Sequence, residues 1–82
     1  MKISVTQEDI DNGKRKECDS CPVALAIMRH FKAKSVWVDV HGIYYYHNDV
    51  NDCGKEPMTK EILEFIIDFD AGRNVKPFDI IL

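Results

Sequence analysis

The sequence predicts an α+β domain in which two main helices and a short N-terminal helix pack on a small, mainly antiparallel sheet of about four strands, with a hairpin at its centre. Residues 2–6 and 35–47 alternate polar and apolar side chains, as half-buried strands do. Residues 21–32 and 59–71 carry apolar residues at helical spacing and are bounded by capping residues. The resulting element order indicates this fold class but leaves the strand order open.

Length and composition indicate one domain, residues 1–82. With 45% hydrophobic and 30% charged residues, the chain is typical of a folded protein near the lower size limit for a self-sufficient core. The formal charge of −3 argues against a nucleic-acid partner, because duplex binding usually rests on a basic surface. The apolar runs are shorter than the roughly 20 residues of a membrane span, and the N-terminus lacks the pattern of a signal peptide. We therefore expect a cytoplasmic protein without a membrane partner.

The first residues predict a strand followed by one or two helical turns. Ile3 and Val5 form the buried side of this strand. Thr6 and Asp9 have the spacing of a capping box, and Gly13 supplies a stop for the short helix.

A second helix is expected over residues 21–32. Asp19 or Ser20 can cap it, with Pro22 in the first turn, where a missing N–H group costs no helical hydrogen bond. Apolar residues cover more than one side of this helix, and Arg29 is its one clearly water-facing residue.

Residues 35–41 and 43–47 predict a hairpin that turns at His41-Gly42, since glycine permits a positive φ angle. Valines then lie on one side of the ribbon. The opposite side carries three aromatic rings, those of Trp37, Tyr44 and Tyr46.

Residues 48–57 are rich in Asn, Asp, Gly and Pro and predict a polar loop without a packed element. Thr59 then caps a third helix that ends at Gly72, and residues 78–82 form a closing strand. The third helix has a main buried stripe and a second apolar edge, formed respectively by Ile62, Phe65, Ile66 and Phe69, and by Leu63 and Ile67.

The three cysteines allow more than one interpretation. Cys18-x-x-Cys21 has the spacing at which two sulfurs reach one zinc ion, and Cys53 with His47 or His41 would complete the ligand set. The second interpretation is packing, with Cys21 as a small buried hydrophobe at the helix start and no cofactor. The third is a redox pair in which the helix N-terminus lowers the pKa of Cys21.

Motifs that carry catalysis are missing from the sequence. It has no Gly-rich phosphate loop, no serine nucleophile elbow and no His-Glu-x-x-His segment. We therefore expect no enzymatic activity and assign no catalytic residue.

Two groups of residues are candidates for binding. Trp37, Tyr44 and Tyr46 need a cover, a partner or a ligand, and such rings dominate binding hot spots. Arg15 and Lys16 precede a helix start, where they could hold an anion such as phosphate, although a solvated loop is the alternative. The excess of apolar surface in so small a domain further predicts a homo-oligomer.

Three blocks of the chain carry a resemblance to a known family. They are residues 3–13, Cys18-x-x-Cys21-Pro-Val-Ala-Leu-Ala26, and the ending from Phe69 through Gly72 to Leu82. Together they resemble a family of small proteins encoded by tailed phages and prophages, which supplies no activity and no functional residues to carry over. The resemblance implies a compact phage accessory protein made in the host cytoplasm. We expect it to bind, and to inhibit or sequester, a host protein of antiviral defence or that defence's nucleotide signal.

Overall fold

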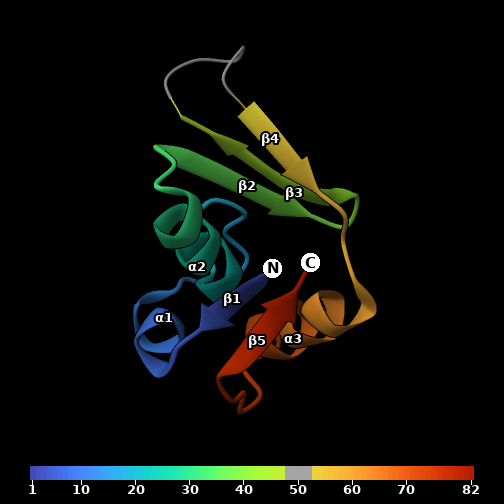
Figure 1. Cartoon of the computed structure of the whole chain (residues 1–82). Coiled ribbons are helices and arrows are strands. Elements are labelled where there is room, and N and C mark those ends of the chain that lie inside the picture. Colours follow the sequence, from blue (N-terminus) through green and yellow to red (C-terminus); the bar gives the residue numbers. More distant parts are fainter. Residues whose placement is uncertain (48–52) are drawn as a thin grey trace.

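The computed structural model describes residues 1–47 and 53–82 (Figure 1). This part of the chain contains three helices and five strands. In chain order they are β1 (Lys2–Val5), α1 (Gln7–Asn12), α2 (Pro22–Phe31), β2 (Ser35–Asp39), β3 (Gly42–Tyr46), β4 (Cys53–Glu56), α3 (Lys60–Asp70) and β5 (Phe78–Ile81). The predicted α+β class and its antiparallel pairing are confirmed.

The strands form two antiparallel sheets where the sequence predicted one sheet of about four strands. β1 pairs with β5, and β2, β3 and β4 form the second sheet in that order. α2 packs on both β1 and β2, so it connects the two sheets through a shared core (Figure 1). The first sheet joins the chain ends, and the Met1 ammonium group donates to the Leu82 carbonyl oxygen at 2.7 Å. Pairing between distant segments has no local sequence signal.

Capping residues set the bounds of α1 and α3, as predicted. Thr6 and Asp9 form a complete capping box, in which each side chain accepts the backbone N–H of the other residue. Gly13 follows as the C-cap. Thr59 caps α3, and Gly72, with φ of 79°, takes the left-handed conformation just after this helix.

The start of α2 differs from the prediction. Cys21 is the N-cap residue, where Asp19 or Ser20 was expected, and its Sγ accepts the N–H of Ala24 at 3.4 Å. Because Pro22 is the first helical residue, the capping position falls on the residue directly before it. The thiol of Cys21 therefore has a local structural role.

The hairpin between β2 and β3 turns at Val40-His41, one residue earlier than predicted. Asp39 fixes this turn, because its Oδ1 accepts the N–H groups of His41 at 2.8 Å and Gly42 at 3.2 Å. Neither central residue has a positive φ, so glycine is not needed between them. The strand pairing is displaced by two residues, and an even displacement leaves each side chain on its predicted face.

β4 occupies part of the segment that the sequence predicted to be a loop; residues 48–52 of that segment lie outside the described residues. Its sequence Cys-Gly-Lys-Glu has no β-branched or aromatic residue, so propensity gave no strand signal. Gly54 is suited to this position because a Cβ there would overlap the ring of Tyr45. The Tyr45 ring in turn stacks on Phe31, with ring centroids 4.1 Å apart.

An ion pair with a buried carboxylate and an exposed guanidinium group ties α1, α2 and β1 together. Asp9 is 4% exposed and accepts hydrogen bonds from Arg29 Nη1 at 2.6 Å and Nη2 at 2.9 Å. Arg29 Nη2 also donates to the carbonyl oxygen of Ser4 at 2.9 Å. Burial alone would raise the pKa of Asp9, but the hydrogen bonds from Arg29 and Thr6, with the charge of Arg29, lower it below its usual value. Arg29 is water-facing as predicted, but the prediction missed its partner.

Candidate binding surface

The outer face of the three-stranded sheet gathers the aromatic residues that the sequence singled out. Along β2, Val36 and Val38 are buried toward α2, whereas Trp37 between them is 48% exposed. Tyr44 lies directly opposite Trp37 on β3, and Tyr46 is two residues further along the same strand. We call the surface formed by Trp37, Tyr44 and Tyr46 the aromatic face.

No helix in the described part of the chain lies against the aromatic face. α2 packs on β2 and β3 from the side of the valines, and the view in Figure 1 shows the helices on that same side of the sheet. The sequence left open that a helix covers the rings. In the described part of the chain, no helix does. Tyr44 and Tyr46 are half-buried, and their strand, β3, is flanked by β2 and β4.

The contacts on the aromatic face are local. Lys55 of β4 stands opposite Tyr44, and its Nζ lies 5.3 Å from the centroid of the Tyr44 ring. Trp37 Nε1 donates to Asp39 Oδ2 at 3.2 Å. The face thus offers broad aromatic surface, one cation and a few hydrogen-bonding groups. Such a composition suits contact with another macromolecule, since Trp and Tyr supply large contact area and a polar tip.

Arg15 and Lys16, the predicted anion holders, lie away from the aromatic face, at the C-terminal end of α3. The backbone N–H of Lys16 donates to Asp70 Oδ1 at 2.9 Å, and the Arg15 guanidinium group lies against Gly72. A helix C-terminus carries partial negative charge, which favours the two cations there. The structure does not bring these residues and the aromatic rings onto one surface.

The residues of the zinc alternative are spread along the sheet. The Cys18 carbonyl oxygen accepts the N–H of Val38 near the hairpin turn, whereas Cys53 pairs with Tyr46 at the far end of β3. His47 Nε2 lies 2.8 Å from the Phe31 carbonyl oxygen. Within residues 1–47 and 53–82, no group of three or more His, Cys, Asp or Glu side chains is arranged to hold a metal ion.

The thiol environments match the packing interpretation of Cys21. Its side chain is buried, and this burial raises the pKa of the thiol despite the hydrogen bonds from Ala24 and Val23. Burial and nearby carboxylates, Asp39 first among them, raise the pKa of Cys18. A redox pair would need a lowered pKa at the attacking thiol.

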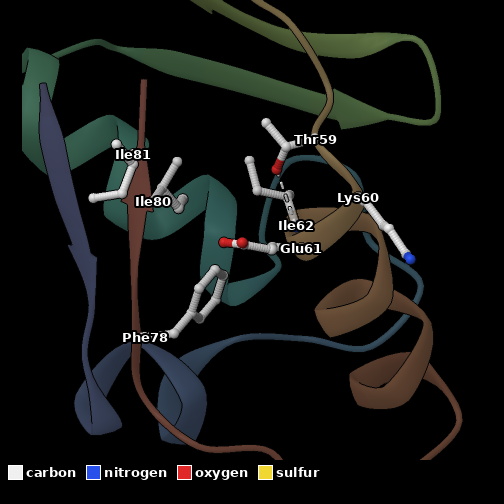
Figure 2. A pocket seen from close by; sticks show the side chains of 7 residues that line it. All are labelled: Thr59, Lys60, Glu61, Ile62, Phe78, Ile80 and Ile81. Atoms are coloured by element: carbon white, nitrogen blue, oxygen red, sulfur yellow. Dashed lines mark hydrogen bonds between the residues drawn. The ribbon is translucent and has the colours of Figure 1, made fainter.

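One hollow lies between the N-terminal end of α3 and β5. In Figure 2, Glu61 points from the helix into this space, and Phe78 and Ile80 point toward the helix from β5. No residue singled out as a binding or metal candidate lines it. Its lining residues are Thr59, Lys60, Glu61, Ile62, Phe78, Ile80 and Ile81.

A second hollow lies between α3 and the end of β2, and we call it the α3–β2 groove. The sequence predicted the surplus apolar edge of the helix but not the groove, because its walls come from segments far apart in the chain. It is lined by Cys18, Val38, Asp39, Val40, Leu63, Ile66 and Asp70. A neighbouring hollow shares four of these residues and adds Lys16, Glu17 and Cys21.

Comparisons of the chain with family models, with curated proteins and with solved structures found no match. Among the described helices, none combines the length and apolar character that crossing a membrane requires. The fold and the surface together define a small α+β domain with an aromatic sheet face that no described helix covers.

Proposed function

We propose that this chain is a non-enzymatic accessory protein of a tailed phage or prophage, made in the host cytoplasm. It binds a host protein of antiviral defence, or the nucleotide signal of that defence, and inhibits it by occupation or sequestration. The phage context rests on the resemblance of the three sequence blocks. The binding role rests on one observation: three aromatic rings share a sheet face that no described helix covers.

A protein is the better-supported partner of the two. Small ligands are usually held in concave sites that enclose most of their surface. Trp37, Tyr44 and Tyr46 line none of the three hollows described above. An open face with Trp and Tyr side chains instead resembles the centre of a protein–protein interface, where these residues are enriched.

We further propose that the chain self-associates. Large apolar side chains are exposed on several elements, among them Trp37, Val40 and Ile67. Association of two copies would remove such side chains from water, which is favourable. Sedimentation at several protein concentrations measures the association directly.

The proposal is tested by capture from infected cells. Tagged wild-type chain and the double variant Trp37→Ala/Tyr44→Ala are recovered, and both protein and small-molecule companions are identified by mass spectrometry. Ile81→Ala is the matched control, because Ile81 is 64% exposed but lies on β5 in the other sheet. We expect the double variant to lose the captured companion and the control to retain it. Unchanged capture and unchanged oligomeric state in the double variant would refute the assignment of the aromatic face.

A further inference from the structure

We infer that the α3–β2 groove is a docking site for a short segment of a partner protein in which an apolar side chain is flanked by lysine or arginine. The groove and the aromatic face lie on opposite sides of β2, because Val38 lines the groove and Trp37 belongs to the face. Asp39 at the end of the strand borders both, since its Oδ2 accepts the Trp37 indole N–H. The inference therefore does not depend on the function proposed above.

The floor and one wall of the groove are apolar. Val38 of β2 and Ile66 of α3 contribute apolar side chains, and Leu63 contributes another from the preceding turn of α3. Val40 at the hairpin turn is 66% exposed beside them. The volume is about 250 Å³. Apolar cavities of about 150 Å³ already accept a benzene molecule, so a leucine-sized or aromatic side chain fits this space.

The charge at the groove selects a cationic neighbour for that apolar side chain. Two of the seven lining residues, Asp39 and Asp70, are acidic, and none is basic. Asp70 also ends α3, where the partial negative charge of the helix C-terminus adds to that of the carboxylate. Lys16 and Glu17 line the neighbouring hollow with opposite charges that offset each other, and Arg15 lies outside the groove, against Gly72.

The two acidic groups are held in place by bonds within the chain. Asp70 Oδ1 accepts the backbone N–H of Lys16, and Asp39 accepts those of His41 and Gly42. The bonds from His41 and Gly42 lower the pKa of the Asp39 carboxyl group and so favour its ionised form. A lysine or arginine beside the apolar anchor thus meets fixed negative charge without rearrangement of the groove, as charge complementarity at an interface requires.

Titration with two probe peptides tests the inference. Blocked hexapeptides of alternating leucine and lysine, and of alternating leucine and glutamate, are added to ¹⁵N-labelled full-length chain while backbone amide shifts are recorded. We expect the lysine peptide to shift the amides of Cys18, Val38 and Ile66, and to bind at least about threefold more tightly than the glutamate peptide, with the difference shrinking at high salt. Equal affinities, shifts confined to other surfaces, or no binding at millimolar peptide would each overturn the inference.

Substitutions then separate the apolar and charged contributions. Asp70→Asn keeps an oxygen for the Lys16 N–H but removes the charge, and Leu63→Ala removes part of the apolar wall. We expect each to weaken binding of the lysine peptide by about twofold to fivefold. Asp79→Asn and Ile81→Ala are the matched controls on β5, where an exposed carboxylate and an exposed apolar side chain lie in the other sheet. Controls that weaken binding as much as the groove variants would also overturn the inference.

Discussion

Replacing Arg29 with methionine should destabilise the domain far more than the exposure of this side chain suggests. Arg29 is 54% exposed, but the carboxylate that it contacts is nearly inaccessible to water. Methionine keeps much of the aliphatic stem and removes both hydrogen bonds to Asp9 and the one to the Ser4 carbonyl oxygen. The carboxylate of Asp9 would then remain buried with only Thr6 as its partner.

The expected loss follows from that geometry. Breaking a fully buried ion pair costs about 3–5 kcal/mol, because an uncompensated charge is left inside. Solvent screens the exposed side of Arg29, so we expect a smaller loss, about 2–3 kcal/mol. For a domain of this size, 1 kcal/mol corresponds to about 4–8 °C in Tm, so the midpoint should fall by at least about 8 °C.

Thermal and urea unfolding followed by circular dichroism measure this loss. Arg73→Met is the control, because Arg73 contacts Asp68 at 2.9 Å with both side chains largely in water, and its loss should cost less than about 1 kcal/mol. In the double variant Asp9→Asn/Arg29→Met, the loss should be smaller than the sum of the single losses. An Arg29→Met variant no less stable than Arg73→Met would refute this reasoning.

The same pair predicts how stability depends on pH. The pKa of Asp9 is lowered in the folded protein, so its stabilising contribution is fully present above the ordinary value of 3.8. That contribution is lost as the pH falls from this value through the lowered pKa. Stability measured between pH 6 and pH 2 should therefore fall less steeply in Arg29→Met than in wild type. If the free energy of unfolding falls equally steeply with decreasing pH in both proteins, Asp9 does not gain this charge-dependent stability from Arg29.

Further outcomes follow from other contacts. Gly54→Ala should cost about 1–3 kcal/mol in urea unfolding, because its Cβ would meet the Tyr45 ring, and wild-type stability would show that the ring does not lie there. At neutral pH, iodoacetamide should label the exposed Cys53 first and the buried, raised-pKa Cys21 last by mass spectrometry; rapid labelling of Cys21 would favour the redox interpretation. Protein purified without chelator should contain far less than one zinc ion per chain, whereas stoichiometric zinc with unfolding on chelation would establish the zinc module.

Local signals in the sequence predicted most of the helix and strand positions. Thr6 and Thr59 accept N–H groups three residues ahead, and Asp9 accepts the N–H of Thr6 three residues behind, so their effect is encoded by spacing alone. Cys21 was missed as a cap because thiols are weak acceptors, although Pro22 marked the position. β4 was missed because its pairing depends on Tyr45 fitting over Gly54, a contact between strands.

The candidate surfaces likewise combine features that local sequence patterns predict with features that depend on contacts between distant segments. Successive side chains of a strand point to opposite faces of the sheet, and this rule placed Trp37, Tyr44 and Tyr46 on one face. The predicted register was wrong by two residues, and an even shift leaves every side chain on the same face. Whether a helix covers the face depends on where α2 packs, which the sequence left open. The burial of Asp9 and the α3–β2 groove likewise arise from contacts between distant segments, for which a single sequence gives no pattern.

Fluorine NMR of chain labelled with 5-fluorotryptophan tests most directly whether the aromatic face is a binding surface, because Trp37 is the single tryptophan. We expect one signal with a clear H₂O/D₂O isotope shift in dilute solution. The signal should broaden and lose that shift at high chain concentration or in an extract of the proposed host cells. A sharp signal with the same isotope shift under all three conditions would mean that nothing covers Trp37 and would contradict the proposed role of this face.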